Sequence, residues 1–228
     1  GGMAGAVSSP RLLVDLVISA IGGLAMFTAF PELSWWPLSI LSLALLFSRV
    51  DRSSLRRALA STAVFAASWW LPLVSWVPLA TGGWLPWVAL AATQVIALCL
   101  WALSAKLLEV WEWARRPWGR MLAYPLSWVG VEQLRSHYPW SGFPWGNVAM
   151  PQVDSPLGTL APWGGEVLVS FVVAAFAIAL RLIFSASSGP VSVRGGTRAG
   201  LVLVLVGVFT GCAFLRLPLA QAAGSGRI

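Results

Sequence analysis

The residue types that can do chemistry gather in one short segment, from Glu132 to Trp145. It holds a carboxylate at Glu132, a guanidinium at Arg135, the single histidine of the chain at His137, and several aromatic rings. Nearly everything around this segment is apolar. An ionisable pair at the edge of a membrane core is costly unless it is partnered, so the segment is a candidate functional site.

Glu132 and Arg135 lie three residues apart, so they share one face of a helix. One interpretation is a structural ion pair that closes the end of that helix. The other is that Arg135 faces an anionic group at the level of the lipid headgroups, because its planar fork suits phosphate or carboxylate. Glu132 would then hold the orientation of Arg135. The residues alone leave both interpretations open.

Two prolines and two glycines follow within residues 139–146, and they exclude a regular helix there. Non-helical backbone at membrane depth is tolerated only against protein or a watery cavity. We therefore expect a loop that folds back over the outer mouth of a helical bundle, with Phe143 and Trp145 packed on acyl chains. An anchor loop at the membrane interface is the alternative.

Other chemistry is sparse. His137 has no nearby Cys or His, so neither a metal site nor a cofactor is predicted. Cys99 and Cys212 lie in apolar runs without CxxC spacing and are interpreted as small apolar side chains. Asp154 and Glu166 are interpreted as solvated or helix-start acids. The common hydrolase, zinc-protease and nucleotide-binding motifs are absent, so no catalytic residue is predicted in this chain.

The composition indicates a membrane protein. Hydrophobic residues make up 58% of the 228 positions and charged residues 10%, against about 25% charged in soluble domains. The net charge of +7 comes from short basic clusters between apolar runs, which argues against nucleic acid as a partner. Among the 15 tryptophans, the pairs Trp35-Trp36 and Trp69-Trp70 are predicted to lie where the bilayer meets water.

A membrane-spanning helix needs roughly 20 apolar residues. The predicted fold is all-α, a polytopic transmembrane helical bundle of about seven helices, which occupies residues 1–221. A loop is expected over residues 185–197 and a linker over residues 222–228. The seven predicted helices cover residues 12–30, 34–48, 57–78, 84–107, 118–136, 162–184 and 199–217.

The basic residues predict how this bundle is oriented. With a cytoplasmic N-terminus, 12 of the 15 basic residues fall on the cytoplasmic side, and only Arg135, Arg216 and Arg227 fall outside. This distribution follows the positive-inside rule. Residues 137–160 and the C-terminus are therefore expected outside the membrane.

Residues 127–170 carry an ordered series of motifs, and weaker echoes lie upstream in residues 29–36 and 75–76. The segment resembles the membrane domain of the apolipoprotein N-acyltransferase family, specifically over residues 128–166 and loosely elsewhere. The matching residues are Trp128, Glu132, Leu134-Arg135, Gly142-Phe143-Pro144-Trp145, Gln152, Pro156-Leu157 and Gly164-Gly165.

The resemblance implies a multi-pass protein of the bacterial plasma (inner) membrane that works in lipoprotein biosynthesis. In that family a nitrilase-like α/β domain on the outer face carries a Glu-Lys-Cys triad. Its cysteine takes an acyl chain from a phospholipid and passes it to the amino group of a diacylglyceryl-cysteine apolipoprotein. This chain shows neither that domain nor the triad. We therefore expect the membrane half of an acyltransferase, inactive alone, with residues 222–228 leading toward the missing domain.

The resemblance also assigns supporting roles. Glu132 and Arg135 would organise the outer mouth, while Phe143 and Trp145 would shape the lipid entrance beneath the catalytic thiol. The implied partners are a phospholipid acyl donor, an apolipoprotein substrate and the bilayer itself.

Three alternatives stay open. In some relatives this type of membrane domain anchors and activates a polyprenyl-phosphate mannosyltransferase. A small transporter would show inward polar residues or inverted repeats, but the predicted helices offer little beyond Thr93-Gln94 and Asp15. A lipid-binding scaffold without enzymatic activity is the third. The coding sequence after Ile228 would separate the first alternative from the acyltransferase.

Overall fold

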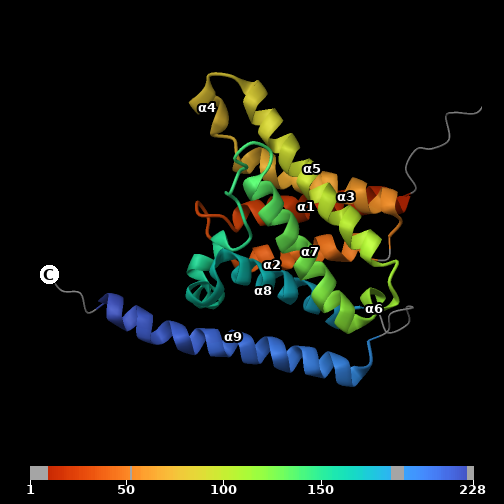
Figure 1. The fold of residues 1–228 in the computed structure, drawn as a ribbon, viewed down its shortest axis with the longest axis vertical. Helices are drawn as coiled ribbons and strands as arrows, with labels where there is room; N and C mark the ends of the chain where they lie inside the picture. Colours follow the sequence, from red (N-terminus) through yellow and green to blue (C-terminus); the bar gives the residue numbers. More distant parts are fainter. Residues whose placement is uncertain (1–9, 52, 186–192, 225–228) are drawn as a thin grey trace, which may run out of the picture.

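The computed structural model describes residues 10–51, 53–185 and 193–224. Every regular element in these ranges is helical, which confirms the predicted all-α fold (Figure 1). Two short 3₁₀ helices, η1 and η2, lie between α7 and α8. The elements are α1 (Pro10–Thr28), α2 (Pro37–Val50), α3 (Leu55–Leu73), α4 (Val77–Thr81), α5 (Trp84–Leu108), α6 (Glu112–Arg115), α7 (Pro117–His137), η1 (Met150–Asp154), η2 (Pro156–Leu160), α8 (Ala161–Ile183) and α9 (Gly195–Gly224).

Each of the seven predicted segments overlaps one helix of at least 14 residues. The short helix α4 begins at the end of the third predicted segment, and α6 lies between the fourth and the fifth. Among the described residues, four helices are long and apolar enough to cross a membrane. They are Arg11–Thr28, Trp84–Leu108, Pro156–Ile183 and Gly195–Arg216. The remaining three spans, which correspond to α2, α3 and α7, stay predictions.

Local sequence explains where several helices begin. Proline occupies the first turn of α2 and of α7, where its fixed φ suits a helix start and no backbone donor is lost. Helix α3 begins after Ser54, whose hydroxyl accepts a hydrogen bond from the Arg57 amide at 3.5 Å. Helix α8 is interrupted at Gly164-Gly165, and Gly165 has a φ of 63°, which glycine adopts without a steric penalty.

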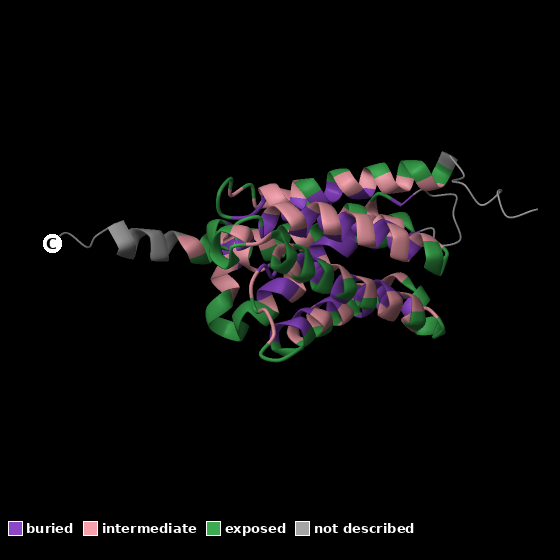
Figure 2. Cartoon of the chain, turned by 90° about the horizontal axis from the view of Figure 1, so that it is seen from above, coloured by how far each residue is buried: buried purple, intermediate pink, exposed green. Residues whose placement is uncertain are grey.

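Six helices pack in a closed ring, in the spatial order α1, α3, α5, α7, α8, α2 and back to α1. Helix α3 also contacts α2 across this ring. Helix α9 lies along one edge and packs on η2 and α8 (Figure 1). The buried turns face the interior of the bundle and the exposed turns face outward (Figure 2). The ring places the C-terminal half of α7 between α5 and α8.

Large aromatic side chains fill the core. Trp101 packs on Phe47 with ring centroids 5.0 Å apart and on Trp128 at 5.2 Å. Trp69 and Trp70 are completely buried in protein, so this pair does not face lipid, and its depth relative to the membrane surface stays a prediction. Trp69 packs on Phe30 and Phe65, and Trp70 packs on Trp69 and Phe143. Composition could not reveal these contacts.

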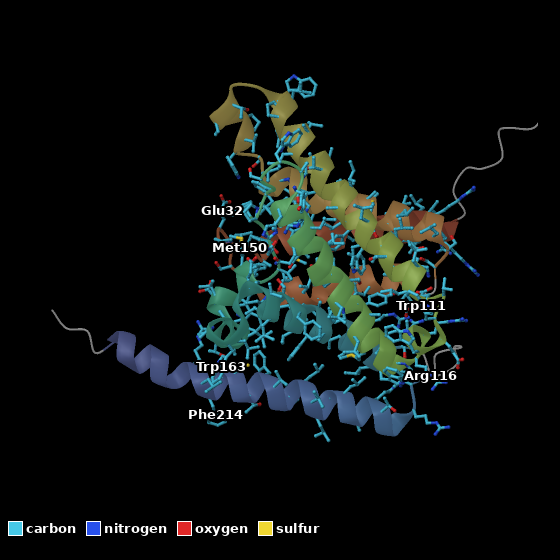
Figure 3. All side chains as sticks on the ribbon, viewed as in Figure 1. Glu32, Trp111, Arg116, Met150, Trp163 and Phe214 are labelled. Atoms are coloured by element: carbon cyan, nitrogen blue, oxygen red, sulfur yellow. The ribbon has the colours of Figure 1, made fainter. Side chains whose placement is uncertain are left out.

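The two ends of the bundle differ in the side chains that they carry. Figure 3 places Glu32, Met150 and Trp163 at one end and Trp111 and Arg116 at the other. We call the first the loop end, because residues 138–160 lie there, and the second the arginine end. At the arginine end, two aspartates each bridge two arginines from different helices. Asp15 binds Arg49 at 2.9 Å and Arg57, while Asp51 binds Arg120 and, at 3.1 Å, Arg181.

Helix α9 runs as far as Gly224, so residues 222–224 of the predicted linker are helical. Residues 225–228 lie outside the described ranges, as do residues 186–192 of the predicted loop. The domain boundary at residue 221 stays a prediction.

Candidate functional site

The chain reverses direction directly after α7 and folds back onto it. The amide of Tyr138 donates a hydrogen bond to the Leu134 carbonyl at 2.9 Å, and the amide of Phe143 donates to the Arg135 carbonyl at 2.9 Å. Gly142 has a φ of 71° and lies so close to the α7 backbone that a Cβ there would overlap it. Residues 138–149, which we call the return loop, therefore lie across the loop end of the bundle.

Arg135 binds the return loop through hydrogen bonds to its backbone and to Asn147. Its side chain comes from α7 and only 5% of the residue is exposed. The carbon Cζ lies 5.0 Å from the centroid of the Trp70 ring, a cation–π distance. Its guanidinium donates hydrogen bonds to the Trp145 carbonyl at 2.9 Å, the Phe143 carbonyl at 3.2 Å, Gln94 Oε1 at 3.3 Å and Asn147 Oδ1.

Glu132 acts on the same loop one turn earlier in α7. It is 4% exposed, and its Oε1 accepts a hydrogen bond from the Val148 amide at 2.9 Å. The side chains of Ser170 and Trp128 face the carboxylate. In the part of the chain that the structure describes, Glu132 and Arg135 form no direct salt bridge, although their charges attract. A cavity of about 10 Å³ borders both side chains, near the lower limit for one water molecule.

The two predicted aromatic residues of the return loop join one cluster with aromatic side chains from three other segments. Phe143 packs edge-on against Trp70 at 6.2 Å and lies 6.1 Å from Trp145. Trp145 in turn meets Phe30 and Trp76, each at 6.4 Å. Both loop rings are partly buried. Their contact with acyl chains stays a prediction. Their contacts with the other aromatic rings hold both side chains in place at the loop end.

Gln152 anchors the segment that follows the return loop. It is completely buried, its Nε2 donates to Ser39 Oγ of α2 at 2.8 Å, and its Oε1 accepts from Ser155 Oγ at 2.6 Å. The Leu157 amide donates to Ser155 Oγ at 3.1 Å, which starts η2. Residues 132–157 are thus tied to α2, α5 and α7 through buried hydrogen bonds.

A cavity of about 580 Å³ lies beside the return loop, among η1, η2, α8 and α9. Its charged lining groups are Glu166, just after the interruption of α8, and Arg216 of α9. Glu166 also accepts a weak hydrogen bond from Gln133 at 3.5 Å. Glu166, which the sequence analysis interprets as a solvated or helix-start acid, lines this cavity at the loop end.

The remaining candidates do not join this network. His137 is exposed, and its Nδ1 lies 2.8 Å from the Gln133 carbonyl. Asp154 is exposed at the end of η1. Cys99 and Cys212 are free thiols. Across the described ranges, no group of three His, Cys, Asp or Glu side chains is arranged to hold a metal ion.

Sequence reasoning missed two partners of Arg135, Gln94 and Asn147. From the sequence, Gln94 is only one of the few polar residues in the predicted helix interiors, and Asn147 carries no prediction. The sequence does carry one signal for such residues: burying an amide side chain among apolar residues costs free energy unless the amide has a hydrogen-bond partner. Gln94 is 3% exposed and Asn147 is 1% exposed, and Arg135 is the partner of both.

A ring of apolar helices, closed at one end by a loop held on buried charged side chains, defines a polytopic helical membrane domain. Residues 22–179 match the family model described as the Apolipoprotein N-acyltransferase N-terminal domain. The chain therefore belongs to the apolipoprotein N-acyltransferase family, as the sequence motifs predicted.

Curated relatives named apolipoprotein N-acyltransferase agree with this match. The chain is 30% identical over 221 residues to the protein from Pseudomonas aeruginosa, which covers 86% of this chain and 41% of that protein. It is 30% identical over 217 residues to the protein from Azotobacter vinelandii, with 91% and 40% covered. With the protein from Ralstonia nicotianae the identity is 32% over 171 residues. The chain thus spans about two fifths of the length of the first two relatives.

Proposed function

We propose that this chain is the membrane domain of an enzyme that transfers an acyl chain from a phospholipid to the N-terminal diacylglyceryl-cysteine of apolipoproteins. The family match and the names of the relatives support this reaction. In the proposal, the bond-making residues belong to a nitrilase-like domain, and the membrane domain binds lipid and positions that domain. The proposal depends above all on the return loop, which Arg135 holds across the loop end of the bundle.

Glu132 and Arg135 are positioning residues in this proposal. Acyl transfer needs the ester of the lipid within about 3–3.5 Å of the attacking group, and a 1 Å misplacement can cost about 10²-fold in rate. Phe143 and Trp145 are partly exposed at the loop end, and we call these two side chains the rim. The buried side chains of Glu132 and Arg135 bind the backbone of the return loop and so fix the position of the rim. A lipid that enters beneath the catalytic domain would meet this rim first.

The proposed orientation has the N-terminus in the cytoplasm and the loop end outside the plasma membrane. The four arginines that pair with Asp15 and Asp51 lie at the arginine end, where the positive-inside rule expects basic residues. The orientation would place the rim of Phe143 and Trp145 in the outer leaflet, where phospholipid and lipoprotein are both accessible.

The test uses the full-length enzyme in bacteria depleted of their own acyltransferase, with N-acylation of a lipoprotein followed by mass spectrometry. We expect Arg135→Ala to lower the rate of transfer by about 10²-fold, because the rim is no longer held in a fixed position. Gln133→Ala is the matched control, since its side chain lies on the same helix but makes only a weak contact with Glu166. Transfer at the wild-type rate by Arg135→Ala would remove the positioning role.

A second measurement tests the assignment of the chemistry. The purified 228-residue chain, given phospholipid and apolipoprotein, is expected to yield no N-acylated product. Measurable transfer by this chain would show that it contains a catalytic group that the proposal does not recognise.

A further inference from the structure

A second cavity of about 580 Å³ lies at the arginine end, in a groove between α2 and α8. The acyl-transfer proposal makes no use of it. Its lining separates into an apolar floor and a cationic mouth. The floor includes Leu41 and Leu45 of α2 and Leu180 of α8, and the mouth carries Arg49 and Arg181.

The positive charge of the mouth comes from two clusters of arginine and aspartate. Arg49 shares the single carboxylate of Asp15 with Arg57, and Arg181 shares that of Asp51 with Arg120. The cluster of Arg49, Arg57 and Asp15 therefore carries a net positive charge. The side chains of Arg49 and Arg181 are 27% and 14% exposed, so both are reachable from the groove but poorly hydrated. A partly desolvated positive charge favours an anionic partner.

The groove follows the shape of an amphiphile. Helices α2 and α8 run in the same direction, and both present leucines before their arginine along the chain. Leu41 precedes Arg49 by two helical turns, or about 12 Å along the axis. Phe184, which is 81% exposed, lines the groove beyond Arg181.

We propose that this groove binds one anionic phospholipid, with its phosphate on Arg49 and Arg181 and an acyl chain along Leu41, Leu45 and Leu180. Guanidinium groups bind phosphate through paired, charge-assisted hydrogen bonds. Basic pockets on the cytoplasmic side of helical bundles recognise anionic headgroups. This lipid is a structural ligand that joins α2 to α8. It is distinct from the acyl donor, which the proposed reaction uses at the opposite end of the bundle.

The test is native mass spectrometry of the purified protein in detergent, titrated with phosphatidylglycerol or with phosphatidylcholine of the same acyl chains. We expect one tightly bound phosphatidylglycerol and at least about fivefold weaker phosphatidylcholine. Arg49→Gln and Arg181→Gln are each expected to weaken phosphatidylglycerol binding about fivefold, the contribution of one basic residue. Arg56→Gln is the matched control, because Arg56 is exposed at the same end but does not line the groove.

Ala44→Trp tests the floor without changing the charge. Ala44 lines the groove, so the larger ring is expected to abolish tight binding of phosphatidylglycerol while both arginines remain. Equal affinity for the two lipids, equal weakening by Arg56→Gln, or wild-type binding by Ala44→Trp would each overturn the proposal. If an arginine variant fails to fold, Ala44→Trp still decides. The binding experiment does not measure acyl transfer, so its outcome does not depend on whether the proposed function is correct.

Discussion

Replacing Arg135 by alanine should release the return loop while the ring of helices stays folded. Arg135 donates four hydrogen bonds, and three of its acceptors, at Phe143, Trp145 and Asn147, belong to the loop. The alanine leaves these buried acceptors without a donor and leaves Glu132 without its nearest positive charge. The loss therefore falls mainly on the contact between the loop and α7.

Its size follows from the burial. Leaving one buried acceptor without its donor costs about 1 kcal/mol or more, so losing the donor of three loop acceptors should cost about 3–4 kcal/mol. Arg135 and Glu132 are 5% and 4% exposed, so solvent screens little of this loss. Since every 1.4 kcal/mol is about a tenfold change in an equilibrium constant, opening of the loop should become about 10²- to 10³-fold more frequent.

Hydrogen exchange of the protein in detergent measures this opening. In the wild type, the Val148 amide is bonded to Glu132 and the Phe143 amide to the Arg135 carbonyl, so both should exchange slowly. In Arg135→Ala both should exchange about 10²- to 10³-fold faster, while amides within α3 and α5 keep their rates. Gln133→Ala should match the wild type. Unchanged exchange at Val148 and Phe143 in Arg135→Ala would show that aromatic packing alone holds the loop.

Three further predictions concern topology and packing. A cysteine at Ser141 should react with an impermeant thiol reagent on intact cells and one at Ser53 only after permeabilisation; the opposite result would reverse the proposed orientation. Asp51→Asn should lower the free energy of unfolding in detergent by about 3–5 kcal/mol, because it leaves two arginines without their shared carboxylate. Thermal unfolding measures this loss, and an unchanged melting temperature would contradict a structural role. Gly23→Ala should cost about 1–3 kcal/mol in the same assay, because the Cβ would overlap the α3 backbone, whereas Gly200→Ala, with open space around it, should cost nothing measurable; equal effects would refute this close approach.

The helices could be predicted from the sequence because a long apolar run has few other structures available to it. The ends were less certain. The segment predicted as 57–78 is divided after Leu73, where Ser75 and Trp76 form a turn before α4. The burial of Trp69 and Trp70 was missed, because tryptophan is favoured both at interfaces and in cores and only the neighbouring helices decide between them.

The candidate site was predictable in part. Glu132 and Arg135 stood out because charges are rare in an apolar chain. Their partners did not, because Gln94 lies 41 residues before Arg135 and meets it only once the ring places α5 beside α7. The aromatic cluster likewise gathers Phe30, Trp70, Trp76 and the return loop from segments far apart in the chain.

The geometry of Glu132 and Arg135 also bears on why a charged pair lies in so apolar a place. At the arginine end, arginine and aspartate bind each other directly. At the loop end the two charges bind backbone instead: Glu132 accepts from the Val148 amide, and Arg135 donates to the carbonyls of Phe143 and Trp145. A loop without regular structure has free backbone donors and acceptors, which are costly at membrane depth. A carboxylate satisfies the first kind and a guanidinium the second, so together they hold an irregular loop that an apolar pair of the same size would leave with unpaired polar groups.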